Sequence, residues 1–207
     1  MSHLTNFLVV VCGRNSEKYI KRCLSSILSQ TYRKFKVCVV DDCSTDATRS
    51  IVSEFIDKNN VKDKFIVEFN NFRKYGLRNK WENSKKHCSS FEDVVVILDA
   101  DDYFTDENSL SRIGKEYLNP NIWATYGNYK NESNGVTRQH HKVVGEFNRT
   151  NPSCYISHVR TFKRHLLDHI NEDHLKDLDG EFFKIVDDLT MEFPIIELCG
   201  EDRVSFI

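Results

Sequence analysis

The sequence predicts an α/β fold in which a mostly parallel, Rossmann-like central sheet is flanked by helices. Short apolar runs alternate with segments of helical periodicity, at the spacing of roughly 30 residues that is typical of βαβ units. Charged residues follow several of the apolar runs directly, and the carboxyl ends of parallel strands are where such sheets bind ligands. We therefore expect a doubly wound sheet with a ligand site along one edge.

The first half of the chain supplies the regular part of this pattern. Apolar runs at 7–11, 35–40, 64–69 and 95–98 are the expected strands, and helices are expected at 20–28, around 51–56, in the 80s and at 110–118. A basic, glycine-containing loop at 73–78 separates the third strand from its helix. These four strands are expected to be parallel because each crossover is long enough to hold a helix.

The second half is less regular. A strand is expected at 122–126, a polar loop at 128–141, and helices at 162–170 and 180–193, the last ending before Pro194 because proline disrupts a helix interior. No linker, repeat or low-complexity tract divides the chain. We therefore expect a single domain over residues 1–207.

Composition limits the function. With 29 basic and 31 acidic residues among 207, the net charge of −2 gives no general attraction to nucleic acid, which is not an expected partner. The seven cysteines are odd in number and lack zinc-site spacing, which favours a reducing compartment. Without a visible signal peptide or an apolar run of membrane-spanning length, the expected location is the cytoplasm.

The run Val95 to Leu98 leads directly into Asp99, Asp101 and Asp102. Carboxylates at the end of a buried strand are costly to desolvate unless a cation or hydrogen-bond donors meet them. If the extended geometry persists, Asp99 and Asp101 share one side, as two ligands of one hard ion require, and Asp102 points elsewhere. The alternative is an ordinary Asp-rich turn that caps the next helix.

Three charged segments follow successive expected strands: Asp41-Asp42, the loop from Arg73 to Arg78, and Asp99 to Asp102. In a parallel sheet these ends lie side by side. Acids that accept from a base or ribose, cations that meet phosphate, and acids that hold a metal together indicate a nucleoside diphosphate.

Four motifs resemble those of glycosyltransferase family 2. They are the segment 39–48 (VVDDCSTDAT), similar to V-D-D-x-S-x-D-x-T; the segment 97–102 (ILDADD), similar to L-D-x-D-D; and the two elements within 15–20 and 25–32 that are similar to N-x-x-x-Y-I and S-I-L-x-Q-T-Y. The resemblance is strong over about residues 6–130 and weaker as far as Gly200.

The resemblance implies the GT-A fold, a nucleotide-binding half at about 1–127 and an acceptor-side half at about 128–207. It implies an inverting hexosyltransferase that uses a nucleotide-sugar donor, most simply a UDP-sugar, with Mn²⁺ or Mg²⁺.

Roles follow by position within the matching motifs. The resemblance implies that Asp41 or Asp42 contacts the uracil, that Arg78 contacts the base or phosphates, and that Asp99 contacts the ribose. Asp101, with Asp99 beside it, would hold the metal, and Asp188 would be the catalytic base.

The first loop departs from the family's I-P-x-Y-N, because Cys12 and Arg14 replace Pro and Tyr. Arg14 and Asn15 are expected to lie beside the diphosphate. His158 and Arg160 are expected to line the acceptor site.

The acceptor itself, whether glycan, lipid-linked or protein, is not readable from the sequence, and a homodimer is left open. Two alternatives remain: a non-catalytic nucleotide-sugar-binding module and a nucleotidyltransferase.

Overall fold

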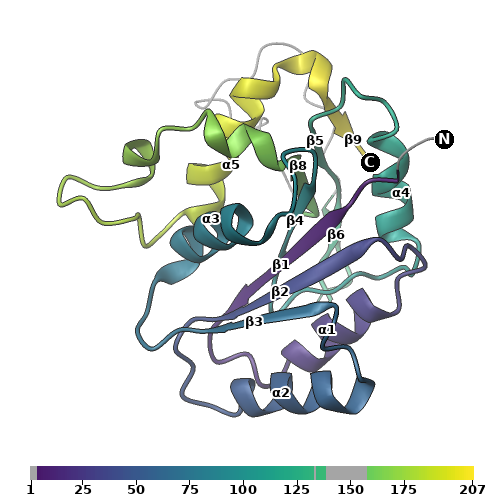
Figure 1. Cartoon of the computed structure of the whole chain (residues 1–207), viewed down its shortest axis with the longest axis vertical. Coiled ribbons are helices and arrows are strands. Elements are labelled where there is room, and N and C mark those ends of the chain that lie inside the picture. Colours follow the sequence, from purple (N-terminus) through teal and green to yellow (C-terminus); the bar gives the residue numbers. More distant parts are fainter. Residues whose placement is uncertain (1–3, 133, 139–157) are drawn as a thin grey trace.

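The computed structural model describes residues 4–132, 134–138 and 158–207. A seven-stranded sheet with the order β3-β2-β1-β4-β8-β5-β9 forms its centre (Figure 1). Its strands are β1 (Phe7–Gly13), β2 (Phe35–Asp41), β3 (Phe65–Phe69), β4 (Val94–Asp99), β5 (Ala124–Tyr126), β8 (Arg160–Lys163) and β9 (Val204–Phe206), and β6 (Tyr129–Lys130) with β7 (Thr137–Arg138) forms a separate hairpin. The helices are α1 (Ile20–Leu28), α2 (Thr48–Asn59), α3 (Tyr75–His87), α4 (Ser109–Glu116) and α5 (Asp187–Cys199), with short 3₁₀ turns η2 (Arg164–Asp168), η3 (Glu172–Leu175) and η4 (Glu201–Arg203).

The strand directions confirm the predicted α/β class. Strands β3, β2, β1 and β4 are mutually parallel, and β8 runs antiparallel between β4 and β5. The last strand, β9, returns parallel to β5 at the other edge. The carboxyl ends of the four parallel strands therefore lie along one edge of the sheet.

Helices cover both faces of the sheet, which explains why its central strands are apolar at most positions. Along β1, Phe7, Val9 and Val11 pack with α1, α2 and α4, whereas Leu8 and Val10 pack with α3, α5 and η2. Figure 1 shows α1 and α2 on one side of the sheet and α3 and α5 on the other. The result is a three-layer arrangement with a core on each side of the sheet.

Two predicted helices in the second half are wrong or displaced. Residues 160–163 form strand β8, followed by the turn η2, because this segment fills the place between β4 and β5 and all four of its residues are buried. Helix α5 begins only at Asp187, since Val186 has φ 61°, which a right-handed helix excludes. It then continues through Pro194, because Met191, Ile195 and Cys199 are held in the core on both sides of the proline.

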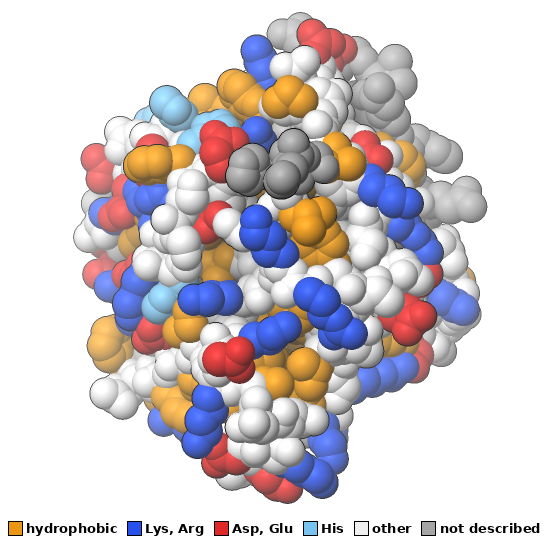
Figure 2. Space-filling view, turned by 45° about the vertical axis from the view of Figure 1, so that its right-hand side comes forward, with side chains coloured by type: hydrophobic (Ala, Val, Ile, Leu, Met, Phe, Trp, Pro, Cys, Tyr) orange, Lys and Arg blue, Asp and Glu red, His pale blue; other side chains and the backbone are white. Residues whose placement is uncertain are grey.

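Charged side chains of both signs are interspersed over the face shown in Figure 2, as expected from the small net charge. In the described ranges, no helix combines the length and apolar character needed to cross a bilayer.

Candidate active site

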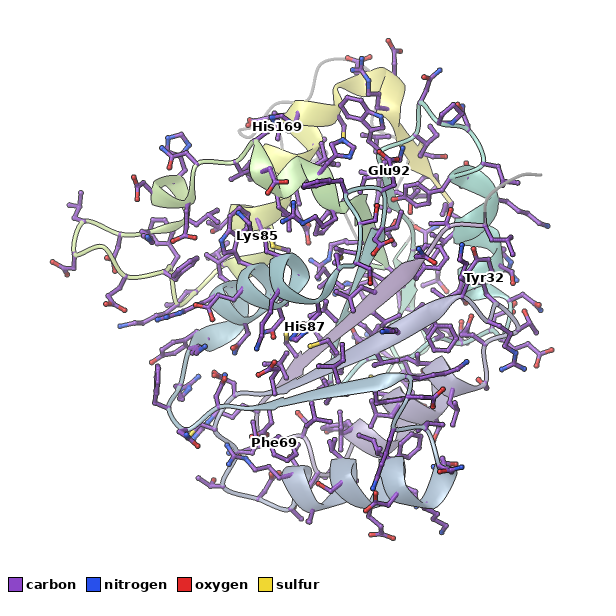
Figure 3. All side chains as sticks on the ribbon, in the orientation of Figure 1. Tyr32, Phe69, Lys85, His87, Glu92 and His169 are labelled. Atoms are coloured by element: carbon purple, nitrogen blue, oxygen red, sulfur yellow. The ribbon has the colours of Figure 1, made fainter. Side chains whose placement is uncertain are left out.

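The carboxyl ends of the parallel strands bring the predicted site segments together. Gly13, at the end of β1, is paired with Asp41 of β2, and the preceding Cys12 is paired with Asp99 of β4. A Cβ added at Gly13 would lie 2.3 Å from the Cβ of Ala100, so only glycine allows the β4 turn to approach this closely. In Figure 3, Phe69 lies at the carboxyl ends of the parallel strands and Tyr32 lies toward their amino ends.

Asp41 and Asp42 are both buried but have different partners. Asp41 Oδ2 accepts from Arg49 Nε at 2.6 Å and from the Ser44 amide at 3.1 Å, whereas Asp41 Oδ1 has no hydrogen-bond partner among the described residues. Asp42 accepts from the amides of Lys74 and Tyr75, at 2.7 and 3.0 Å. The first acid therefore joins β2 to α2, and the second holds the loop that leads into α3.

Asp42 also accepts from Asn70 Nδ2 at 3.1 Å. Burial alone would raise the pKa of Asp42, but hydrogen bonds from Lys74, Asn79, Asn70 and Tyr75 lower it below its ordinary value. A lowered carboxyl pKa stabilises the folded state above the unfolded pKa, and this contribution is lost as the pH falls through the folded value.

Replacing Asp42 with asparagine is therefore expected to lower the free energy of unfolding by about 2 kcal/mol at pH 7, because two backbone N–H groups lose their carboxylate acceptor. The difference from the native protein should shrink below about pH 4, where the carboxyl of the unfolded chain binds a proton before the folded one does. Urea denaturation at pH 7 and pH 3 measures both values. Asp57→Asn, which alters an exposed pair with Lys62, is the matched control. An unchanged difference at the two pH values would contradict this assignment.

The other predicted nucleotide contacts border the same edge. Asn15 has φ 54°, and its Oδ1 accepts from the Thr45 amide at 2.9 Å, which ties the first loop to the second. Arg14 Nε donates to the Cys43 carbonyl at 3.4 Å and the side chain is exposed. Arg78 lies in the first turn of α3, rather than in a loop, and its Nε donates to Glu82 at 2.7 Å. Both guanidinium groups are thus partly exposed and near the loops that close this edge.

Asp99, the last residue of β4, has basic side chains close to both of its oxygens. Lys80 Nζ lies 3.0 Å from Oδ1, while His158 Nε2 and an Arg160 amino group lie 3.5 and 3.7 Å from Oδ2. Burial opposes its ionisation, but the hydrogen bond from His158 and the charges of Lys80 and Arg160 hold the pKa of Asp99 well below its ordinary range. Asp99 is therefore a carboxylate at neutral pH.

The expected geometry of the acid cluster is wrong beyond the strand end. The chain turns at Ala100 and Asp101, so the alternation of a strand does not continue. Asp102, and not Asp101, comes close to Asp99, and both share His158 Nε2 at 3.5 Å. One ligand atom from each of Asp99, Asp102 and His158 lies within 4.8 Å of the others, a set that could hold a metal ion. Asp101 is exposed beside this group, and its role as a ligand stays a prediction.

Burial raises the pKa of Asp102, and the neighbouring Asp99 and Asp101 raise it further against the opposing charge of His158. Two carboxylates this close repel each other, and a cation between them would relieve that repulsion. Two carboxylates and one imidazole are ligands that suit Mn²⁺, and the carboxylates alone suit Mg²⁺. The residues present therefore fit the divalent cation that the resemblance implies.

Behind the cluster, a buried ion pair joins β8 to α5. Arg160 Nε lies 2.6 Å from Glu192 Oε1, and both side chains are almost fully buried. Residue 188 precedes Glu192 by four positions, about one turn, in α5. The side chain of Asp188, the predicted base, is outside the part of the chain that the structure describes.

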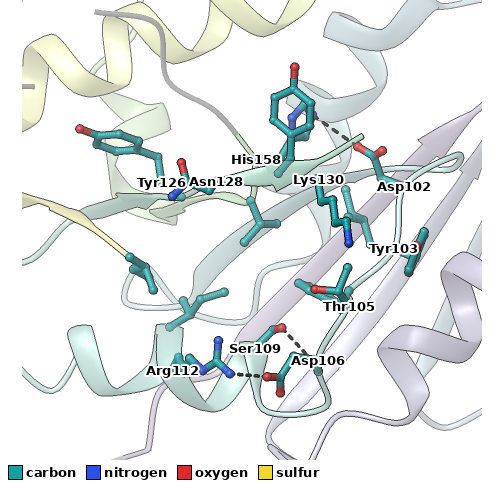
Figure 4. Close-up of a pocket in the computed structure, with 17 residues that line it drawn as sticks. Asp102, Tyr103, Thr105, Asp106, Ser109, Arg112, Tyr126, Asn128, Lys130 and His158 are labelled. Carbon is teal, nitrogen blue, oxygen red and sulfur yellow. Dashed lines mark hydrogen bonds and ion pairs between the residues drawn. The ribbon is translucent and has the colours of Figure 1, made fainter. Parts of the chain in front are cut away.

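A cavity of about 240 Å³ opens on the other side of Asp102 and His158 (Figure 4). Its walls come from the loop after β4, from α4 and from the β5 to β6 segment, and they include Tyr103, Tyr126 and Lys130. Aromatic rings beside hydroxyl and ammonium groups suit the faces and edges of a sugar. His158 and Asp102 form the wall that this cavity shares with the acid cluster.

The sequence did not lead us to expect Lys80 and Glu192 near the site, or a contact of His158 with Asp99 and Asp102. Lys80 falls between Leu77 and Trp81, on the buried face of α3, and Glu192 stands beside Met191 in an apolar helix. A charged residue on the apolar face of a helix was the available signal. Nothing local connects His158 with Asp99, since β8 reaches β4 only through the fold.

A model of the family described as "Glycosyl transferase family 2" matches residues 8–175. The chain belongs to glycosyltransferase family 2. The family resemblance and the GT-A fold expected from four motifs are confirmed, and the match extends through the cavity-lining segments and β8.

Among the curated relatives, poly(ribitol-phosphate) beta-N-acetylglucosaminyltransferase TarS of Staphylococcus aureus (strain Mu50) is 39% identical over 106 residues, which cover 50% of this chain and 18% of TarS. The Escherichia coli enzyme UDP-Glc:alpha-D-GlcNAc-diphosphoundecaprenol beta-1,3-glucosyltransferase WfgD is 31% identical over 139 residues, which cover 67% of this chain and 49% of WfgD. The chain thus spans less than half the length of either relative.

Among solved structures, S. aureus TarS 1-349 in complex with UDP-GlcNAc superimposes with a TM-score of 0.72 at 23% identity, covering 98% of this chain and 56% of that one. The mannosyltransferase PcManGT from Pyrobaculum calidifontis, in complex with GDP-Man and Mn²⁺, gives 0.68 at 19% identity and covers 100% of this chain and 55% of that one. At these identities the likeness establishes the fold.

Proposed function

We propose that this chain transfers a hexosyl group from a UDP-sugar to an acceptor hydroxyl, with inversion and with the help of Mn²⁺ or Mg²⁺. The observation that carries the proposal is the convergence of Asp99, Asp102 and His158 beside a sugar-sized cavity, at the edge where the loops after β1, β2 and β3 also meet. The relatives support the donor class, because TarS is seen with UDP-GlcNAc and the name of WfgD specifies UDP-Glc.

The cation would be held at the end of β4. Asp101 and Asp99 are the ligands proposed from the sequence, and the geometry adds Asp102 and His158 as neighbours that can complete the set. When bound there, the cation would offset the negative charge that builds on the departing diphosphate. Arg14 and Arg78, which border the same edge, would add positive charge on the phosphate side.

Asp41 and Asp42 are the two acids considered for the contact with the uracil ring. Asp42 already accepts from four groups of α3 and of the segment that leads into it, which leaves it the task of fixing that segment. Asp41 Oδ1 is a buried acceptor with no partner among the described residues, and buried acceptors are nearly always satisfied. We therefore assign the uracil N–H to Asp41. Asp99, with its carboxylate held by Lys80, Arg160 and His158, would accept from a ribose hydroxyl.

The acceptor would enter through the cavity beside Asp102 and His158. Its hydroxyl is a weak nucleophile until its proton is removed, and Asp188 would take that proton as the bond to the sugar carbon forms. Attack from the side opposite the diphosphate inverts the anomeric centre. Position 188 suits this role because it belongs to α5, whose Glu192 pairs with the Arg160 beside Asp99.

Release of UDP separates an enzyme from a non-catalytic binding module. The chain is incubated with UDP-glucose, UDP-galactose and UDP-GlcNAc in the presence of Mn²⁺, and free UDP is measured over time. We expect at least one donor to be hydrolysed faster by the native chain than by Asp101→Asn. If the chain binds UDP but releases none beyond that of the variant, the module is the correct interpretation.

A further inference from the structure

Lys80 is a buried lysine in the middle of α3. Only 2% of its surface is exposed, and the helix positions around it, Leu77, Trp81 and Ser84, are buried as well. Lysine is almost never fully buried unless its charge is paired, because desolvating an ammonium group is costly. Its Nζ lies 3.0 Å from Asp99 Oδ1. The carboxylate at the end of β4 is therefore one partner that permits this burial.

The second oxygen of Asp99 is fixed from the opposite side by Arg160, which is itself held by Glu192 of α5. Lys80 and Arg160 belong to α3 and β8, and α3 also packs directly on α5. Figure 1 shows α3 and α5 covering the same face of the sheet. Three elements that are distant in sequence thus set the orientation of one carboxylate.

This arrangement leaves Asp99 with capacity for a ligand. Each carboxylate oxygen has two acceptor sites, and the Asp99 side chain is 29% exposed, toward the edge where the strands end. Without Lys80, the Oδ1 atom would lose its close cationic partner among the described residues, and the carboxylate would be held at Oδ2 by His158 and Arg160. A carboxylate held at one oxygen can turn toward those groups and away from the nucleotide.

We propose that Lys80 is a positioning residue of the donor site, which fixes Asp99 in the orientation that receives the ribose of the nucleotide. The proposal rests on the function proposed above. It adds a residue of α3 to the site and predicts that the effect of Lys80 on the donor passes through Asp99.

The first experiment compares Lys80→Met with Lys80→Arg. Methionine keeps the length of the side chain and removes its charge, whereas arginine keeps the charge. We expect Lys80→Met to weaken UDP binding, measured by titration calorimetry, and to raise the donor KM, each by about tenfold, with a smaller change in kcat. Lys80→Arg should recover part of the loss. Lys86→Met is the matched control, because Lys86 lies on the same helix with its side chain 60% exposed.

The decisive experiment is a double-mutant cycle with Asp99→Asn. If Lys80 acts through Asp99, Lys80→Met/Asp99→Asn binds UDP as weakly as Asp99→Asn alone. Losses that multiply, or a Lys80→Met variant that binds UDP within twofold of the native chain, would overturn the proposal. If Lys80→Met does not fold, the double variant, which removes both buried charges, is compared directly with Asp99→Asn. A native chain that binds no UDP at all would instead refute the proposed function.

Discussion

Replacement of Asp188 by asparagine is expected to lower kcat by two to four orders of magnitude, the range of about 10²–10⁴ that a general base contributes. The variant keeps the shape of the side chain and removes its ability to accept a proton. UDP binding should change by less than about twofold, because the proposed donor contacts come from Asp41 and Asp99. The measurement is the single-turnover rate with saturating donor, alongside a UDP titration.

Glu197→Gln is the control for this experiment, since Glu197 is exposed on the same helix. It should retain the native rate. An Asp188→Asn variant within threefold of the native rate would show that the base is another group. A variant that loses UDP binding as well would assign Asp188 to the donor and not to the acceptor.

Removal of divalent cations is expected to have a comparable effect. Treatment with EDTA should reduce transfer by more than about 100-fold, because the leaving diphosphate would lose the charge that stabilises it, and added Mn²⁺ should restore the rate. His158→Ala should raise the Mn²⁺ concentration needed for half-maximal activity by about tenfold. The exposed His169 provides the control variant His169→Ala. Transfer that continues in EDTA, or a His158→Ala variant with an unchanged need for Mn²⁺, would contradict the proposed cation site.

The regular half of the fold could be predicted because its local pattern and its tertiary role agree. Apolar runs such as 7–11 form strands covered on both faces, and the stripes in α1 and α2 face the core. The segment 162–170 shows the opposite case. Phe162, Leu166 and Ile170 recur at helical spacing, yet residues 160–163 are a strand, because only that conformation fills the gap between β4 and β5. This requirement comes from distant parts of the chain and has no local signal.

The same distinction applies to the site. Charged residues at the ends of apolar runs identified Asp41, Asp42 and Asp99, since the edge of a parallel sheet is a property of the fold class. The side-chain alternation used for Asp101 holds only inside a strand, and the turn at Ala100 ended it. His158 reaches Asp99 from the segment just before β8, and Lys80 reaches it from α3, so their position beside Asp99 became visible only in three dimensions.

The most direct test of the account is a calorimetric titration of the native chain with UDP, in the presence and absence of Mn²⁺. If the acids at the end of β4 and the diphosphate share one cation, Mn²⁺ should tighten UDP binding by at least about tenfold. The variants Asp101→Asn and His158→Ala should reduce this gain in affinity. Equal affinity with and without Mn²⁺ would contradict the central claim.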